Sequence, residues 1–297
     1  MILVTGGTGF IGRHLVKVLV EEGSKVRCLA RRLSEQGQFF QGAEFICGDV
    51  TDQYTLTKAC HGAEVVIHLV AIIREKGGST FEKVNVQGTR NIVTAAEAAG
   101  VRRFIHMGAL GTRDDPAYRY AFSKWQGEEI VRKSSLNWTI IKPSLVYGEG
   151  FGFFNRLIQS IKMCPPPFVP VPGSGKTRFQ PIAVEDLVKC IKILLKNENF
   201  TGISCELGGP EQLTYEQMLD ILMNTLGVRR VKLHIPILLM RIVVPLMGAL
   251  LKDPPVTSVE LKQMDYNNVA EKDAVEKLFG FKPRRLSEGL GYITESF

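Results

Sequence analysis

Short apolar runs alternate with longer amphipathic stretches through the first half of the chain. The apolar runs are four or five residues long and predict strands at 1–5, 25–29, 44–47, 65–69, 103–107 and 139–142. Between them, apolar residues recur at the spacing of one helix face and predict helices at 12–22, 53–60, 80–99 and 121–133. Mostly apolar strands are typical of a parallel sheet covered on both faces. The pattern therefore predicts an α/β fold with a doubly wound parallel sheet.

This alternation stops after about residue 147. Pro165, Pro166 and Pro167 are followed closely by Pro170 and Pro172. Helical patterns return at 184–196, 215–226 and 270–279. We therefore expect a first domain over 1–147 and a smaller C-terminal α/β substrate or docking lobe over 148–297. One or two elements are expected to be exchanged between them.

The loop between the first strand and the first helix carries a glycine array. Gly6, Gly9 and Gly12 form the pattern G-x-x-G-x-x-G. Glycines at this spacing allow a tight turn, close approach of backbone to a pyrophosphate, and close packing of helix on strand. The free N–H groups at a helix N-terminus favour an anion. Because the loop lies between a strand and a helix, it predicts a Rossmann dinucleotide site rather than a plain turn.

The end of the second strand indicates which dinucleotide binds. NAD-binding units usually carry an acidic residue there for the ribose 2′-hydroxyl, whereas this chain carries Arg31 and Arg32. A charge-assisted contact of Arg with a 2′-phosphate contributes about 1.5–3 kcal/mol. NADP(H) is therefore favoured over NAD(H), with solvated loop cations as the alternative. Asp49, after the third strand, is placed to accept from the adenine amino group.

Five motifs occur along the chain in the order of one family, at 5–12, 48–50, 84–89, 120–124 and 142–148. Together they resemble the extended and atypical short-chain dehydrogenases/reductases, which include sugar-nucleotide epimerases and dehydratases, over essentially the whole chain. The resemblance implies a hydroxyl or carbonyl substrate of unknown identity. It implies dinucleotide contacts from Gly6, Thr8, Gly9, Phe10, Ile11, Gly12, Arg31, Arg32, Asp49, Val50, Leu69, Val70, Ala71, Asn85, Lys124, Pro143 and Val146.

Tyr120 and Lys124 lie four residues apart on a predicted helix and so share one face. The resemblance implies that Tyr120 is the catalytic acid/base, and that Lys124 tunes it and holds the nicotinamide ribose. A tyrosine must lose most of about three pKa units to act near neutral pH. A neighbouring ammonium and the positive nicotinamide both stabilise the phenolate. By itself the spacing also occurs on plain helix surfaces.

The third catalytic group of the family is a Ser or Thr at the end of the fifth strand, where it polarises the substrate carbonyl. Gly108 stands where that hydroxyl is expected. Loss of one such donor typically lowers the rate by about 10²–10³. Thr112 and Ser123 are the substitutes nearest in sequence. The predicted cofactor pocket is therefore complete, whereas the predicted catalytic constellation is not.

Three further segments, at 104–111, 178–186 and 253–257, narrow the resemblance to one atypical branch. This branch contains the reductase-like accessory subunit of respiratory complex I and its bacterial homologues. In that branch the nucleotide is mainly structural. The closer resemblance thus implies an NADP(H)-stabilised protein whose turnover is weak or lost.

Composition and residue spacing bear on three further questions, namely nucleic-acid binding, metal binding and cellular location. The net charge is +7, but Lys and Arg are scattered, so no nucleic-acid partner is expected. The six cysteines lack metal-like spacing and the five histidines lack carboxylate clusters, so no metal site is predicted. His68 and His106 are interpreted as packed or hydrogen-bonded near the pocket rim. The N-terminus has no basic leader, which indicates a cytoplasmic protein, with a location peripheral to a membrane left open.

The most apolar stretch runs from His234 to Leu251 and is interrupted by Pro236, Arg241 and Pro245. We interpret it first as a helix buried in the smaller lobe. The alternatives are an apolar substrate pocket, or a surface facing a membrane, a membrane protein or a quinone-linked partner. Its flanking basic residues are Arg229, Arg230, Lys232 and Lys252. Residues 173–177 resemble the end of a phosphate-binding loop, but we interpret them as a hairpin turn.

Two functions therefore stay open. One is an NADP(H)-dependent oxidoreductase or epimerase-like enzyme that uses Tyr120 and Lys124. The other is a catalytically weak, NADP(H)-stabilised accessory or assembly protein of a respiratory or quinone-linked system. The intact Tyr/Lys pair favours the first, and Gly108 together with the apolar stretch favours the second.

Overall fold

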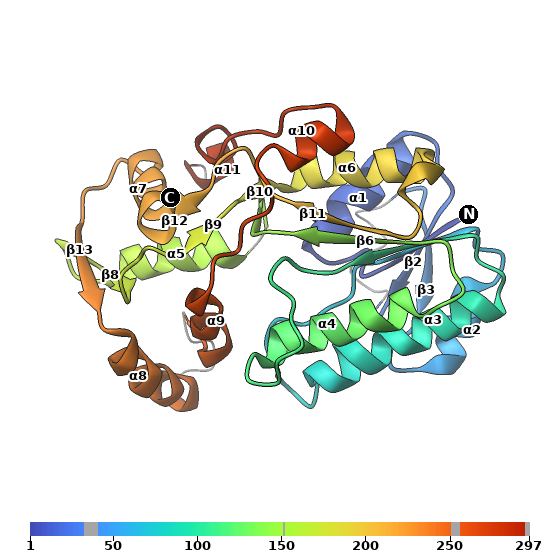
Figure 1. The fold of residues 1–297 in the computed structure, drawn as a ribbon, viewed down its shortest axis with the longest axis horizontal. Helices are drawn as coiled ribbons and strands as arrows, with labels where there is room; N and C mark the ends of the chain where they lie inside the picture. Colours follow the sequence, from blue (N-terminus) through green and yellow to red (C-terminus); the bar gives the residue numbers. More distant parts are fainter. Residues whose placement is uncertain (33–40, 151, 251–255, 295–297) are drawn as a thin grey trace. The chain divides into compact units, whose positions relative to one another are not determined.

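A parallel sheet forms the centre of the first half of the chain (Figure 1). The computed structural model describes residues 1–32, 41–150, 152–250 and 256–294. These residues belong to two units. Unit 1 contains Met1–Lys142 and Val188–Cys205, and unit 2 contains Pro143–Leu187 and Glu206–Phe297. Leu251, Lys252 and part of the 253–257 segment lie outside the described residues.

The sheet of unit 1 has seven strands in the order β11-β6-β5-β4-β1-β2-β3. The pairs among β1 to β6 are all parallel. The strands are β1 (Ile2–Thr5), β2 (Val26–Ala30), β3 (Glu44–Cys47), β4 (Val65–His68), β5 (Arg103–Met107), β6 (Trp138–Pro143) and β11 (Ile203–Leu207). The predicted α/β class with a doubly wound parallel sheet is confirmed. Reversal of strand order beside β1 places the carboxyl ends of β1 and β4 at the switch point where dinucleotides bind in such sheets.

Helices cover both faces of this sheet (Figure 1). They are α1 (Phe10–Glu21), α2 (Gln53–Cys60), α3 (Gly88–Ala98), α4 (Arg119–Arg132) and α6 (Val184–Lys196), and a π-helical segment, η1 (Glu82–Gln87), leads into α3. Leu3, Phe104 and Ile140 from neighbouring strands are fully buried against Leu56 of α2 and Ile92 of α3. The strands are apolar because side chains on both faces are covered.

A buried arginine ties the returning segment 188–205 to the sheet of unit 1. The Arg103 guanidinium, at the start of β5, donates to Thr201 Oγ1 at 2.5 Å and to Thr139 Oγ1 at 3.0 Å. It also donates to the carbonyl of Leu194 at 3.3 Å, at the end of α6. Part of the second half of the chain is thus held against the sheet that the first half forms.

Unit 2 contains three pairs of short strands. β7 (Val146–Tyr147) pairs with β10 (Ile182–Ala183), β9 (Arg178–Phe179) with β12 (Leu213–Thr214), and β8 (Phe168–Pro172) with β13 (Val231–Ile235). Its helices are α5 (Gly152–Met163), α7 (Tyr215–Thr225), α8 (Ile237–Leu250), α9 (Ser258–Lys262), α10 (Ala274–Phe279) and α11 (Gly291–Thr294). Tyr147, Phe154, Val171, Met218 and Leu286 belong to its core.

Two interpretations of this half of the sequence are wrong. Residues 173–175 do form a turn, but β8 and β9 on either side of it do not pair with each other, so it is no hairpin. The apolar stretch forms α8, but this helix is not buried: Leu238 is 71% and Ile242 is 65% exposed. Periodicity could not reveal this, because an almost wholly apolar helix looks the same whether protein covers it or not. No helix within the described residues is both long and apolar enough to cross a membrane.

Arg103→Lys should destabilise the protein by about 2–4 kcal/mol. An ammonium cannot reach the guanidinium's acceptors on two segments at once, so buried acceptors lose their donors. Urea unfolding measures the change, and Arg102→Lys, at the exposed neighbouring position, is the control. Equal stabilities of the two variants would contradict this account of how segment 188–205 is held.

Candidate dinucleotide and catalytic site

The glycine loop between β1 and α1 is so tight that two of its residues cannot carry a side chain. A Cβ on Gly12 would lie 2.1 Å from the carbonyl oxygen of Gly6. Gly6 itself has a φ of 75°, and a Cβ there would lie 3.1 Å from the backbone nitrogen of Val70. The Gly9 N–H donates to the Gly6 carbonyl at 3.0 Å and closes the turn.

The outer side of the same loop is open. Gly9 is exposed, and Thr8, Phe10 and Ile11 are half-buried. α1 starts directly after Gly9 and carries no acidic residue in its first turn. The N-terminus of α1 therefore meets no carboxylate from its own first turn, and the loop fits a pyrophosphate.

The residues predicted to hold the adenosine half lie after β2 and β3. Arg31 and Arg32 directly follow β2 and are exposed. Asp49 Oδ1 accepts from the N–H and the hydroxyl of Thr51, both at 2.8 Å. This turn orients the half-buried Asp49 carboxylate, while Val50 is buried. The arrangement fits the predicted contacts and leaves the choice between NAD(H) and NADP(H) as a prediction.

Asn85 holds the loop that follows β4. This buried residue lies in the π-helical segment η1. Its side chain accepts from the Ile72 N–H at 2.8 Å and donates to the Ile72 carbonyl at 3.1 Å. It also donates to Ser123 Oγ on α4 at 3.0 Å. The predicted contact residues Leu69, Val70 and Ala71 come just before the clamped residue, so Asn85 positions the loop that carries them.

The predicted catalytic pair lies on α4, beside the end of β5. Tyr120 is half-buried, and its ring contacts that of Phe81 edge-on with 5.9 Å between centroids. Lys124 is buried, and its ammonium donates to the Met107 carbonyl at 2.5 Å. Burial lowers the pKa of Lys124 to about 8, against an opposing effect of the nearby Glu128 carboxylate. The lysine is thus charged at neutral pH and held one helical turn from Tyr120.

Glu128 is a site residue that the sequence analysis did not single out. Its side chain is fully buried, and its carboxylate accepts from Arg132 at 3.1 Å and from the Thr112 hydroxyl at 3.2 Å. A Cβ on Gly108 would lie 2.6 Å from Glu128 Oε1. A side chain at position 108 would therefore point into this carboxylate. In the sequence, the four-residue spacing of Lys124 and Glu128 was the pattern that could have indicated this residue, because it places both side chains on one face of the helix.

The two hydroxyls considered as substitutes for the missing carbonyl-polarising group are both hydrogen-bonded to other groups of unit 1. Gly108 and the half-buried Ala109 have no hydroxyl. Thr112 donates to Glu128, and Ser123 donates to the Tyr120 carbonyl at 2.8 Å. Both substitutes that the sequence offered are thus engaged inside unit 1.

Two buried histidines lie behind this pair, in register on β4 and β5. His68 shares hydrogen bonds with Thr5 Oγ1 at 2.6 Å and Thr89 Oγ1 at 3.2 Å. It stacks on His106, whose two ring nitrogens have no hydrogen-bond partner among the described residues. Burial lowers the pKa of His68 to about 3 and that of His106 well below 6.5, and the Lys124 charge adds to both shifts. Both imidazoles are neutral at pH 7.

Two predicted contacts belong to the other unit. Pro143 ends β6, and Val146 pairs with Ile182 between β7 and β10. Their contact with a dinucleotide stays a prediction. No group of His, Cys, Asp and Glu side chains within the described ranges could hold a metal ion.

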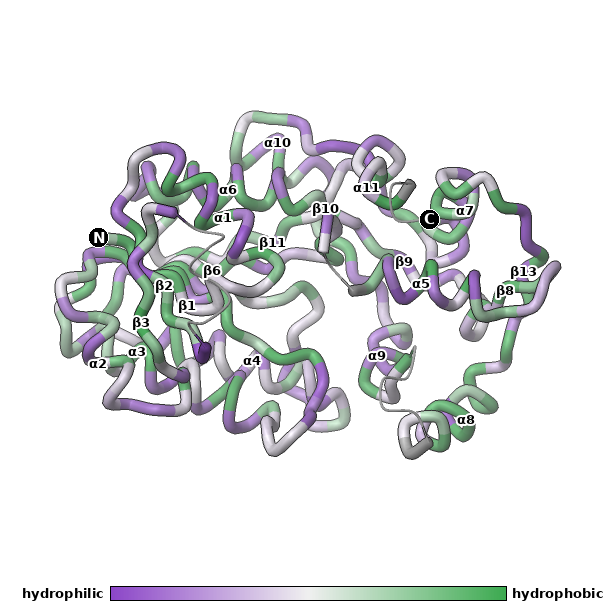
Figure 2. The backbone as a smooth tube through the Cα atoms, turned by 180° about the vertical axis from the view of Figure 1, so that it is seen from behind, coloured by the Kyte–Doolittle hydropathy of each residue, from purple (hydrophilic) through white to green (hydrophobic). Residues whose placement is uncertain are grey.

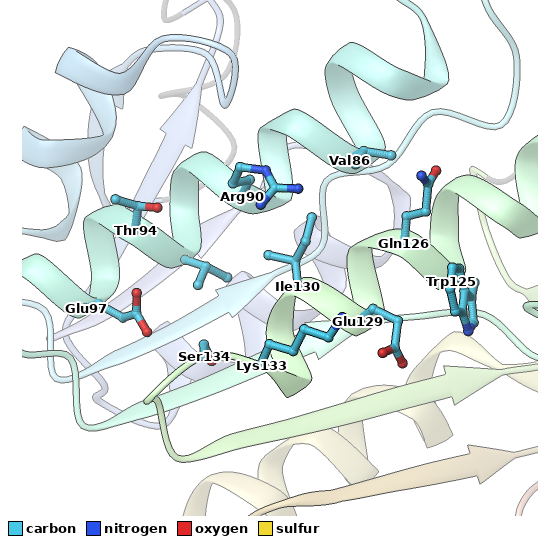
Figure 3. Close-up of a pocket in the computed structure, with 11 residues that line it drawn as sticks. Val86, Arg90, Thr94, Glu97, Trp125, Gln126, Glu129, Ile130, Lys133 and Ser134 are labelled. Carbon is cyan, nitrogen blue, oxygen red and sulfur yellow. The ribbon is translucent and has the colours of Figure 1, made fainter. Parts of the chain in front are cut away.

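A surface groove of about 420 Å³ lies between α3 and α4 in unit 1 (Figure 3). Arg90 and Glu97 of α3 face it from one side, and Trp125 and Glu129 of α4 from the other. The residues that line it include none of those predicted to bind the dinucleotide or to catalyse. It is therefore separate from the candidate site.

The family model of the NAD dependent epimerase/dehydratase family matches residues 2–204. The chain belongs to this family. The matched segment contains the glycine loop, the Tyr120/Lys124 pair and all but the last residue of the returning segment 188–205. The predicted membership in the epimerase/dehydratase-like short-chain dehydrogenases/reductases is confirmed.

Several curated relatives of this epimerase/dehydratase chain are known. Ceramide reductase of Caulobacter vibrioides is 35% identical over 192 residues, which are 63% of this chain and 58% of that protein. NADH dehydrogenase (ubiquinone) 1 alpha subcomplex subunit 9, mitochondrial, of Arabidopsis thaliana is 30% identical over 245 residues, 79% of this chain and 60% of that protein. The chain thus spans about three fifths of the length of these two relatives.

A third relative is an epimerase. N-acetyl-alpha-D-glucosaminyl-diphospho-ditrans,octacis-undecaprenol 4-epimerase of Escherichia coli O157:H7 is 30% identical over 247 residues, 76% of this chain and 70% of that protein. Among solved structures, gox2253 has a TM-score of 0.78 at 24% identity and covers 100% of this chain and 98% of that one. UDP-glucuronic acid 4-epimerase of Bacillus cereus, in complex with UDP-glucuronic acid and NAD, has a TM-score of 0.74 at 20% identity, with 100% and 99% covered. These structures show the shared fold.

The buried histidines should make the folded protein sensitive to acid. Their pKa values lie below the usual 6.5, so the unfolded chain binds more protons between about pH 6.5 and 3. The free energy of unfolding should therefore fall as the pH drops through this window. His106→Leu breaks no hydrogen bond and should change stability at pH 7.5 by less than about 1 kcal/mol while flattening the acid loss.

Urea unfolding at a series of pH values measures this effect. His61→Gln, at an exposed position, is the matched control and should keep the wild-type pH dependence. A His106→Leu protein that loses stability with acid as steeply as the wild type would refute the assignment.

Proposed function

We propose that this chain is an NADP(H)-binding oxidoreductase or epimerase-like enzyme that acts on a hydroxyl or carbonyl group of a small molecule. The observation that carries the proposal is the buried Lys124 ammonium at the end of β5, one helical turn after Tyr120. Burial of a charge costs desolvation free energy, which its interactions in the folded protein must offset. In the proposed role, the Lys124 charge favours the phenolate form of Tyr120.

Tyr120 is the proposed acid/base. The Lys124 charge favours the phenolate, so Tyr120 takes a proton from a substrate hydroxyl or returns one to a carbonyl. The bound nicotinamide would supply or accept the hydride. Met107 holds the lysine through its carbonyl, and Asn85 holds both Ser123 and the loop after β4. These contacts fix the position of α4 relative to the end of β5. Proton transfer requires the reacting groups to be held in place in this way.

NADP(H) is the proposed dinucleotide. Arg31 and Arg32 are exposed directly after β2, where the ribose 2′ position lies in Rossmann units. Relatives of the same fold, including the Bacillus cereus epimerase, hold NAD. The proposal therefore rests on the two guanidinium groups of this chain and on the fact that β2 ends without a carboxylate.

A catalytically weak accessory protein is the second candidate. It is favoured by the missing hydroxyl at positions 108 and 109, and by the likeness to NADH dehydrogenase subunits of Arabidopsis thaliana and Dictyostelium discoideum. In that role the dinucleotide would stabilise unit 1, and a membrane complex would be the partner. The protein would then be peripheral to a membrane, in the cytoplasm.

Tyr120→Phe separates the two candidates. In the enzyme it should lower turnover of NADPH with a carbonyl substrate by about 10²–10⁴-fold and leave the dissociation constant for NADPH within about threefold. Steady-state rates and calorimetry measure both quantities. Tyr118→Phe, two residues earlier, is the control. Absence of any turnover in the wild type across a broad carbonyl panel, with tight NADPH binding, would favour the accessory role.

Replacing both arginines tests the choice of dinucleotide. Arg31→Gln/Arg32→Gln should weaken NADPH binding by about 10–100-fold, since each contact with a 2′-phosphate contributes about 1.5–3 kcal/mol and part of it is screened. NADH binding should change by less than about threefold. Calorimetry with both dinucleotides measures the ratio. A wild type that binds NADH more tightly than NADPH would overturn the proposed preference.

A further inference from the structure

Exposed apolar side chains are concentrated in one segment of unit 2. Among the described residues, twelve large hydrophobic side chains are exposed, and seven of them lie between Val231 and Leu246. Two more, Met163 and Phe168, belong to the adjoining α5 and β8. In Figure 2, most of the described part of α8 has the colour of hydrophobic residues. Scattered exposed residues are ordinary, but a cluster of this kind marks an interaction surface.

The exposed residues of α8 form one face of the helix. They are Leu238, Leu239, Ile242, Val243 and Leu246. At about 100° per residue these side chains span an arc of roughly 140°. The buried Val244 lies on the opposite side, and α8 packs on α9. The helix is therefore held by its own unit along one side and presents an unbroken aliphatic face along the other.

The strand pair that leads into α8 extends this apolar surface. β8 and β13 are parallel, with Phe168 beside Val231 and Pro170 beside Leu233. Val231 and Leu233 are two residues apart and so project from the same face. Val169 and Val171, on the other face of β8, are buried. The outward face of the pair is thus apolar and lies directly before the start of α8 at Ile237.

The charged side chains of the segment from Ile221 to Leu250 are all basic. From Ile221 to Leu250 the chain has Arg229, Arg230, Lys232 and Arg241 and no Asp or Glu. Lys232 pairs with Asp220 at 2.7 Å, and Arg241 with Asp265 at 3.2 Å. Arg229 is exposed, and neither it nor Arg230 has an ion-pair partner among the residues described. An apolar face with uncompensated arginines beside it complements an anionic interface over hydrocarbon.

The chemistry of the face favours lipid over a second copy of the chain. Protein interfaces combine apolar contacts with about one hydrogen bond per 100–200 Å² and are enriched in aromatic residues. The exposed face of α8 consists of Leu, Ile and Val and offers no polar side chain. The helix has 14 residues, about 21 Å, which is shorter than the roughly 30 Å hydrocarbon core. It can lie in a bilayer surface but cannot cross it.

We propose that the surface formed by the exposed face of α8 and the outer face of the β8–β13 pair binds the surface of an anionic lipid bilayer. The aliphatic side chains enter the boundary between headgroups and acyl chains. Arg229 and Arg230 lie among anionic headgroups. This binding requires neither a bound dinucleotide nor turnover, so it stands or falls independently of the proposed function.

Co-sedimentation of the full chain with vesicles tests the proposal. We expect binding to vesicles of phosphatidylcholine with about one third phosphatidylglycerol, and weaker binding to phosphatidylcholine alone, since each basic residue near an anionic surface contributes about a fivefold gain. Ile242→Glu/Leu246→Glu should lower the partition coefficient by roughly tenfold or more for each side chain. Leu278→Glu, at an exposed leucine of α10, is the matched control and should bind like the wild type.

Two further measurements make the outcome decisive. A thermal shift with NADPH, equal for all variants, shows that unit 1 is folded, and circular dichroism shows the same helix content. Size-exclusion chromatography with light scattering gives the oligomeric state. Wild-type protein that stays in the supernatant with both vesicles would overturn the proposal. So would an Ile242→Glu/Leu246→Glu protein that binds as tightly as the wild type, or a wild-type dimer that this variant splits and that does not bind vesicles.

Discussion

The dinucleotide site of unit 1 depends on one close approach of the backbone to itself. The carbonyl of Gly6 lies where a Cβ of Gly12 would be, so β1, the loop and α1 can pack in this way only if residue 12 is glycine. This packing places the N-terminus of α1 at the carboxyl edge of the sheet. The helix N-terminus then offers N–H groups to an anion without any basic side chain.

Several polar side chains are buried behind this edge of the sheet. Their burial is compatible with a stable fold because each is either hydrogen-bonded or uncharged. Lys124 is satisfied by the Met107 carbonyl, and Glu128 by Arg132 and Thr112. Burial keeps His68 and His106 neutral, so they add no charge beside the lysine. This arrangement leaves one buried ammonium positioned beside the face that carries Tyr120. A site organised in this way can serve proton transfer.

Unit 2 follows a different physical rule. Its core, around Tyr147, Phe154 and Met218, is packed like that of any small domain. The segment from β13 to α8 instead exposes aliphatic side chains to water, at about 1.5–3 kcal/mol for each one left unburied. A surface with this cost indicates that a membrane or another molecule covers it for part of the time. The short length of α8 and the basic residues near it restrict which kind of molecule or surface can cover it.

The alternation of strands and helices, the glycine loop and the Tyr120/Lys124 spacing could all be predicted from the sequence, because they are local patterns set by side-chain period and backbone freedom. The apolar character of the stretch from His234 to Leu251 was also visible there. Three features became visible only in the folded chain: the exposure of α8, the place of Glu128 beside Gly108, and the return of segment 188–205 to Arg103 in unit 1. Each of these depends on which distant residues meet, and hydrophobic periodicity carries no information about the partner that covers a face.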